Sequence, residues 1–312
     1  FLVTEFFVVA LPLMITSAKA DGHPIQAITH AGFGGGTDVT TRMMLLRTRR
    51  YLKQDMQLVN KKGGGGAASM DYMMTLPADG QHTLTWTTGH AVSMALGKTK
   101  VKLSDMQPLA RGTDDPQLFV VNCKNDIKDA KKFISAQKSK SLKYGTTHVG
   151  GIDDVSAIAF TKKGKLTDPT IVPYKGVGPI KTNLIKGDID VGVLNLGEAV
   201  TEIEDGTLCV SVVLASNRME KLSNVPTATE LGIPVVLSTV RGFVTRKGVP
   251  ADRKKQLEDA MIKAMEHKYF QSFLTDIGLD STSVVGADEW GKQMEVMLAE
   301  MTAQLKALGY IN

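Results

Sequence analysis

Glycine-rich loops constrain the fold of this chain more than any other feature of its sequence. They span residues 32–38, 63–68 and 145–151, and each lies between a strand-like apolar segment and a segment with helical spacing. A helix that begins at such a loop presents free amide groups and the positive end of its dipole, which favour an anion. Glycine also lets a ligand approach the backbone without a Cβ clash. One such loop alone indicates only a tight turn, but two facing loops predict a ligand cleft in an α/β fold.

Strand-like and helical segments alternate along the chain, which predicts mostly parallel sheets with helices on both faces. The predicted strands are residues 23–28, 57–60, 82–86, 117–122, 189–194 and 208–214. The predicted helices include residues 38–54, 70–76 and 128–137, and the first of them should bury Val39, Met43 and Leu46. A final helix carries an apolar stripe that is more typical of core packing than of a partner groove: Trp290, Met294, Met297, Met301 and Leu305.

Composition excludes several classes of protein. With 43% apolar and 22% charged residues, the chain is neither disordered nor fibrous, and its 312 residues suit roughly two domains. The net charge of +5 is diffuse and aromatic residues make up only 6%, so no nucleic-acid partner is expected. Cys123 and Cys209 are too few for a disulfide scaffold. They could pair in an oxidising compartment, and the sequence leaves this open.

The N-terminal segment resembles an export signal. Residues 6–15 form an apolar run, and Ala18 and Ala20 place small residues at the positions of a cleavage site. The run is too short for a comfortable membrane span. A signal peptide over residues 1–20 is therefore predicted, with the periplasm as destination. The alternative is a buried N-terminal strand or helix.

The glycine loops fail the tests for common cofactor motifs. The first loop lacks the lysine of a P-loop. Gly63, Gly65 and Ala68 fit only a permissive dinucleotide pattern, without an acidic residue at the expected offset. The histidines lack metal-site spacing, and no nucleophile elbow is present. No cofactor, no metal and no catalytic residue are predicted.

Six ordered blocks carry a resemblance to a known family. They are residues 34–42, 59–66, 77–84, 142–146, 172–176 and 224–232. From about Pro24 to Gly309, the chain resembles the periplasmic substrate-binding receptors of tripartite tricarboxylate transporters, also called the Bug family.

The resemblance implies a two-lobe periplasmic-binding-protein fold of type II with a hinge. Residues 21–120 with 237–312 would form one lobe, and residues 121–236 the other. Such a receptor would capture a small carboxylate, such as a di- or tricarboxylate, hydroxy acid or amino acid, and deliver it as a monomer to membrane permease subunits. It would not be an enzyme. The alternatives are an α/β enzyme that uses Asp154 with His148, and a ligand sensor for a membrane kinase.

The predicted ligand-binding residues come from two glycine loops and from strand ends. They are Phe33, Gly34, Gly35, Gly36, Thr37, Asp38, Thr87, Thr88, Thr146, Thr147, His148, Gly150, Gly151, Asp153, Asp154, Asn195 and Arg241. Amides at two helix N-termini would clamp the ligand carboxylate. Asp38 with Arg42 could instead be an intrahelical ion pair or a cap.

Two positions depart from the family pattern. Asp154 stands where many relatives have His, and Arg241 where many have Trp. Asp153 or Asp154 could equally be a helix N-cap, and Arg241 could belong to a surface ion pair. Together they suggest the hypothesis of a ligand with an acid at one end and an amine or hydroxyl at the other.

Overall fold

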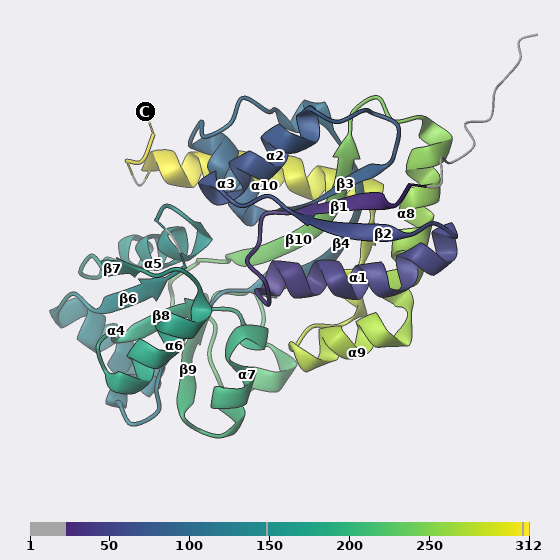
Figure 1. Cartoon of the computed structure of the whole chain (residues 1–312). Coiled ribbons are helices and arrows are strands. Elements are labelled where there is room, and N and C mark those ends of the chain that lie inside the picture. Colours follow the sequence, from purple (N-terminus) through teal and green to yellow (C-terminus); the bar gives the residue numbers. More distant parts are fainter. Residues whose placement is uncertain (1–22, 148, 308, 312) are drawn as a thin grey trace, which may run out of the picture.

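The computed structural model describes residues 23–147, 149–307 and 309–311. The predicted signal peptide and His148 lie outside these residues. Two α/β lobes lie side by side, each built around its own sheet (Figure 1). The predicted two-lobe α/β fold is therefore confirmed.

The first lobe contains a six-stranded sheet in the order β11-β4-β10-β3-β1-β2. Its strands are β1 (Ile25–Thr29), β2 (Met56–Asn60), β3 (His82–Thr87), β4 (Met106–Pro116), β10 (Ser238–Arg246) and β11 (Val285–Gly286). β1 pairs in parallel with β2 and β3, whereas β10 runs antiparallel to β3 and β4, and β11 runs antiparallel to β4.

The second lobe contains a five-stranded sheet in the order β7-β6-β8-β5-β9. Its strands are β5 (Leu118–Asn122), β6 (Lys143–Thr146), β7 (Thr170–Pro173), β8 (Val191–Leu194) and β9 (Leu208–Val213). β6 pairs in parallel with β7 and β8, whereas β5 runs antiparallel to β8 and β9.

Most strands of each sheet run in the same direction, as predicted, but both sheets are mixed, because β10 and β11 in the first lobe and β5 in the second run against the others. The chain leaves the first lobe along β4 and returns along β10, so these two neighbouring strands must run in opposite directions. They meet where Ser238 pairs with Pro116. The sequence prediction missed both strands, because buried charged residues such as Arg111, Asp115 and Arg241 interrupt their apolar pattern.

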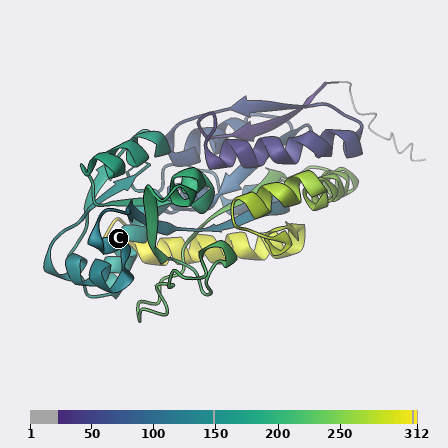
Figure 2. The same ribbon diagram turned by 90° about the horizontal axis from the view of Figure 1, so that it is seen from below.

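Helices cover both faces of each sheet, as predicted. In the first lobe they are α1 (Gly36–Leu52), α2 (Ala67–Met74), α3 (Thr88–Ala95), α8 (Ala251–Glu266), α9 (Lys268–Asp276) and α10 (Ala287–Ala307). In the second lobe they are α4 (Ala130–Ser139), α5 (Ile152–Lys163), α6 (Val177–Lys186) and α7 (Leu196–Glu204). Short 3-10 turns are η1 (Gly64–Gly66), η2 (Leu103–Asp105), η3 (Asp126–Lys128), η4 (Glu220–Leu222) and η5 (Ser281–Ser283). The C-terminal end of α10 reaches from the first lobe to α5 of the second (Figures 1 and 2).

The buried face of α1 differs from the predicted one. Leu46 is 46% exposed, and the buried side chains include Thr41, Met44, Thr48 and Leu52. The hydroxyls of Thr41 and Thr48 donate to the carbonyls of Thr37 and Met44, which satisfies these polar groups inside the core. A search for apolar residues alone therefore selected the wrong face.

The methionine stripe of α10 is core packing, as predicted. Trp290, Met294, Met297, Met301 and Leu305 are all buried. The rings of Trp86 and Trp290 lie 5.8 Å apart, edge to face, so the stripe packs directly on the sheet.

The two cysteines, whose pairing the sequence left open, form a disulfide. Cys123 and Cys209 have Cα atoms 5.0 Å apart and join the end of β5 to β9. The bond is compatible with an oxidising compartment. No helix among the described residues is long and apolar enough to cross a membrane.

We expect Gly242→Ala to lower the free energy of unfolding by about 1–3 kcal/mol, because overpacking strains a full core. A Cβ at Gly242 would overlap Cε2 of the buried Trp290 ring. Urea denaturation measures the effect. Gly178→Ala in α6 is the matched control, because nothing lies within 4 Å of its added Cβ. Equal stability of the two variants would contradict the packing described here.

Candidate ligand cleft

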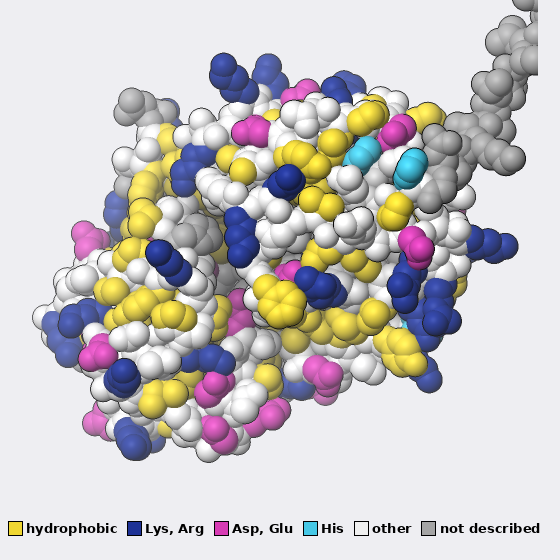
Figure 3. Space-filling view, viewed as in Figure 1, with side chains coloured by type: hydrophobic (Ala, Val, Ile, Leu, Met, Phe, Trp, Pro, Cys, Tyr) yellow, Lys and Arg dark blue, Asp and Glu magenta, His cyan; other side chains and the backbone are white. Residues whose placement is uncertain are grey.

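Each lobe contributes one of the predicted ligand loops, at the point where a strand leads into a helix. In the first lobe, β1 leads through residues 30–35 into α1, and in the second, β6 leads through residues 147–151 into α5. A third helix, α7, begins just after β8. The space-filling view is hollowed between the lobes (Figure 3). Ligands of α/β proteins bind at the carboxyl ends of parallel strands, so this hollow is the candidate site.

Arg241 on β10 links the two lobes. Its Nη1 donates to Asp115 Oδ2 at 3.0 Å, and its Nη2 donates to Asn195 Oδ1 of the second lobe at 3.3 Å. Its Nε donates to the hydroxyl of Thr37 at 3.3 Å, at the start of α1. Arg241 is only 3% exposed, so the alternative of a surface ion pair was wrong and the pair with Asp115 is buried. Nε, Nη1 and Nη2 each donate within the protein, so most of its donors are already used and are not free for a second ligand carboxylate.

Asn195 ties α7 to the strand that crosses between the lobes. Its Nδ2 donates to the carbonyls of Asp115 and Pro116 at 2.9 and 3.0 Å. Its backbone amide donates to Glu198 Oε2 at 3.0 Å, which forms a capping box at the start of α7. Asn195 therefore connects the predicted site to the crossing strand.

One backbone amide of the first loop is already hydrogen-bonded to a side chain of the same segment. The amide of Gly34 donates to Asp38 Oδ2 at 3.0 Å, and Arg42 Nε donates to the same oxygen at 2.9 Å. The intrahelical ion pair considered for Asp38 and Arg42 is thus present. The amides of Gly36, Thr37 and Asp38 lie in the first turn of α1, where the helix itself offers no carbonyl to accept their hydrogen bonds. Phe33 stands 86% exposed at the tip of the loop.

In the second loop, backbone amides likewise donate hydrogen bonds to carboxylates of nearby aspartates. Asp153 Oδ2 accepts from the amide and the hydroxyl of Thr147 at 2.9 and 2.6 Å, and Asp154 Oδ2 accepts from the amide of Gly150 at 2.6 Å. Gly151 is the N-cap residue of α5, so neither aspartate is an N-cap. Both belong to the first turn and reach back to the loop. The predicted clamp of loop amides is therefore already occupied at Gly34, Thr147 and Gly150.

Thr87 and Thr88, predicted at a strand end, are buried against other elements. The amide of Thr87 donates to His90 Nδ1 at 3.0 Å, which leaves the His90 proton on Nε2, 3.0 Å from Ser69 Oγ. Burial lowers the pKa of His90 well below its ordinary value, so this ring stays neutral. The hydroxyl of Thr88 bridges the Ser238 carbonyl and the Val240 amide. These threonines position β10 rather than face the hollow.

Asp115 and Glu198, two acidic residues that interact with Arg241, were not predicted from the sequence. Burial raises the pKa of Asp115 to about 6, against the lowering effect of Arg241. The pKa of Glu198 is raised to about 7, chiefly by burial and in smaller part by the charges of Asp153 and Asp115, against the lowering effects of the Asn195 amide and Arg241. Glu198 could have been found as the fourth residue of the capping-box pattern that begins at Asn195. Asp115 has no comparable sequence signal.

The protonation of Glu198 predicts a pH-dependent stability. Its folded pKa lies above its unfolded value, so the folded state holds a proton that the unfolded state releases, and stability falls as pH rises through 7. Between pH 6 and pH 8, we expect wild type to lose about 1 kcal/mol more than Glu198→Gln. Urea denaturation of both proteins at the two pH values measures this difference. His90 contributes equally to both proteins and cancels, and parallel pH profiles would contradict the prediction.

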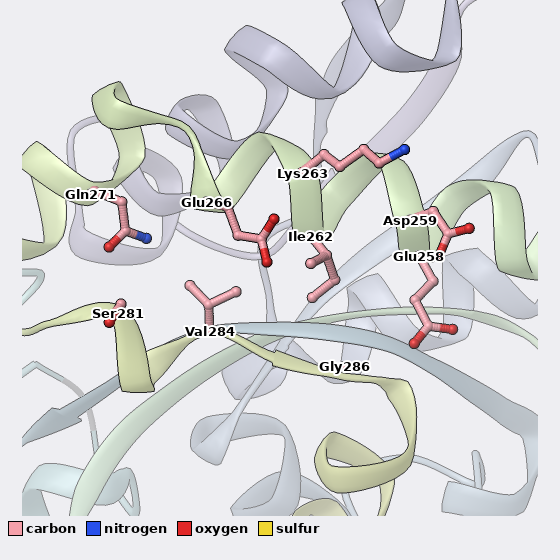
Figure 4. A pocket seen from close by; sticks show the side chains of 9 residues that line it. All are labelled: Glu258, Asp259, Ile262, Lys263, Glu266, Gln271, Ser281, Val284 and Gly286. Atoms are coloured by element: carbon pink, nitrogen blue, oxygen red, sulfur yellow. The ribbon is translucent and has the colours of Figure 1, made fainter.

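Two cavities lie away from the cluster around Arg241. One, of about 680 Å³, is lined by α8 and the segment around Val284, with Ile262 and Glu266 directed toward that segment (Figure 4). The other, of about 690 Å³, lies between Arg111 of β4 and Lys221 of the second lobe. Neither contains a predicted ligand-binding residue. Among the residues that the structure describes, no group of three or more His, Cys, Asp or Glu side chains could hold a metal ion.

Comparison with known proteins identifies the family. The sequence model described as the tripartite tricarboxylate transporter family receptor matches residues 40–308. The chain is 27% identical over 220 residues to Protein BugT of Bordetella pertussis, covering 68% of this chain and 66% of BugT.

Solved structures share the fold. MatC from Rhodopseudomonas palustris with bound malate superposes with a TM-score of 0.79 at 23% identity, covering 90% of this chain and 98% of MatC. A second R. palustris protein, solved with adipate, gives a TM-score of 0.81 at 21% identity and covers 92% and 97%. The family model matches well over half of the chain, as the six sequence blocks predicted. The chain belongs to the receptor family of the tripartite tricarboxylate transporters.

Proposed function

We propose that this protein is a periplasmic solute receptor that captures a small carboxylate between its lobes and delivers it to a membrane permease. The observation that carries the proposal is the cluster around Arg241, which joins the start of α1 in one lobe to Asn195 in the other. Family membership supports it, as do the malate and adipate in two structural relatives. In this role the protein binds its ligand without chemical change.

Two crossing segments would form the hinge. Gln117 donates its amide to the Leu237 carbonyl at 2.9 Å, and Leu237 donates to the Leu214 carbonyl at 3.0 Å. We propose lobes of residues 21–120 with 237–312, and 121–236, with the first crossing refined to Gln117 between β4 and β5. A ligand that contacts both lobes would favour the closed form by its extra affinity for that form.

The ligand carboxylate would meet the open amides of Gly36, Thr37 and Asp38 at the N-terminus of α1. The glycines around them add no side chains of their own, although the guanidinium of Arg241 lies beside Gly36. Thr146 and Gly151 would approach from the other lobe, and His148 belongs to the proposed site from its sequence alone. A signal peptide over residues 1–20, periplasmic delivery to permease subunits and a monomeric state belong to the same proposal.

A thermal-shift screen of the purified protein against di- and tricarboxylates, hydroxy acids, amino acids and aromatic acids tests the proposal. A ligand with micromolar Kd, present at millimolar concentration, should stabilise the protein by about 4 kcal/mol. The bound compound should be recovered chemically unchanged. Turnover of the compound, or a panel without any stabilising carboxylate, would refute the proposed function.

A further inference from the structure

The charged side chains near the cleft are paired differently in the two lobes. In the first lobe, Arg42 pairs with Asp38, and Arg241 pairs with Asp115. In the second lobe, Asp153 and Glu198 stand at the starts of α5 and α7, and among the described residues neither forms an ion pair. The second lobe therefore contributes two carboxyl groups without an ion-pair partner to the region of the cleft.

These carboxylates form one cluster with the buried ion pair. Glu198 interacts electrostatically with Arg241, Asp153 and Asp115. The cluster thus contains three carboxyl groups and one guanidinium group. Asp153 is only 6% exposed and Asp115 only 3%, so solvent screens their charges poorly.

The cluster also contains a buried acceptor without a donor. Asp115 uses Oδ2 for Arg241, whereas its Oδ1 is buried and has no hydrogen-bond partner among the described residues. The hydroxyl of Thr146, at the end of β6, is likewise buried without a partner. Buried polar atoms of this kind ordinarily have partners, and a missing one points to a ligand group that supplies it.

We propose, resting on the proposed function, that the ligand is an amino acid whose ammonium group faces the cluster of Asp115, Asp153 and Glu198. Its carboxylate lies at the N-terminus of α1, where the amides of residues 36–38 are open. The ammonium supplies N–H donors to the acidic cluster and balances part of its negative charge. Asp153, Glu198 and Asp115 are then specificity-determining residues.

Matched pairs of ligands test the proposal. Succinate and aspartate, glutarate and glutamate, and 3-phenylpropionate and phenylalanine each differ by one α-ammonium group. Calorimetric titration should give, in the pairs that bind, about tenfold or greater preference for the amino acid. An equal or stronger affinity for the plain carboxylic acid would overturn the amino-acid proposal while leaving the carboxylate receptor intact. If none of the six compounds binds, and no carboxylate in the wider screen binds either, the receptor proposal itself is refuted.

Variants locate the subsite. Asp153→Asn keeps an oxygen for the Thr147 amide and hydroxyl, and Glu198→Gln keeps the capping box. Each should weaken amino-acid binding about tenfold and leave the plain acid almost unchanged. Asp129→Asn, the same change at the N-cap of α4, is the control and should alter neither affinity. Parallel losses for both members of a pair would overturn the assignment of these carboxylates to the ammonium group.

Discussion

Arg241→Met is expected to lower the free energy of unfolding by about 3–5 kcal/mol, because it leaves a buried carboxylate without its counter-charge. Asp115 is only 3% exposed, and Arg241 is its ion-pair partner. The variant also removes the donors to Thr37 and Asn195, which link α1 to the second lobe. Urea denaturation at neutral pH measures the loss.

Two further variants show whether the buried charge is the cause. Combining Arg241→Met with Asp115→Leu removes both charges and should recover most of the lost stability, as replacing a whole buried pair often does. Arg42→Met removes another arginine–aspartate pair, but the Arg42 side chain is 48% exposed, so about 0–1 kcal/mol is expected. Equal losses in Arg241→Met and Arg42→Met would contradict the central role given to Arg241.

Gly35→Leu is expected to weaken ligand binding by about 100-fold or more, because its side chain would cover the open amides at the start of α1. Gly35 is the N-cap residue of α1 and has φ −72°, which leucine adopts without strain. Its added Cβ would approach only the Gly32 carbonyl, at 3.3 Å. The fold should therefore survive, as circular dichroism and thermal denaturation can check.

The same substitution at another helix N-terminus is the control. Gly178 lies in the first turn of α6, and nothing lies within 4 Å of its added Cβ. Gly178→Leu should bind the best carboxylate of the screen as wild type does, by calorimetric titration. Undiminished binding by Gly35→Leu would remove the first loop from the ligand site.

The alternation of strands, glycine loops and helices was predictable because these are local signals, whereas the two lobes were predicted from the family resemblance. The family blocks add order along the chain, and the family model bears them out. The strands β4 and β10 were not predictable in the same way. Their charged residues look like loop residues until the partner on the neighbouring strand is known, as Arg241 and Asp115 illustrate.

The structure shows contacts for the predicted site residues that differ from the roles predicted for them. Arg241 and Asn195 do meet at the cleft, but Arg241 pairs with Asp115 rather than standing open. Asp153 and Asp154 close their own loop instead of capping a helix as N-cap residues. Such roles depend on contacts between residues far apart in sequence, and no local pattern encodes them.

Hydrogen exchange measured by mass spectrometry tests the central claim most directly, namely that a carboxylate binds between the lobes. With the best ligand of the screen at saturating concentration, amides in both segments 32–38 and 145–151 should exchange more slowly, one segment from each lobe. The segments that line the cavity beside α8, around Glu266 and Val284, should be unaffected. Protection confined to one lobe, or centred on that cavity, would contradict the account.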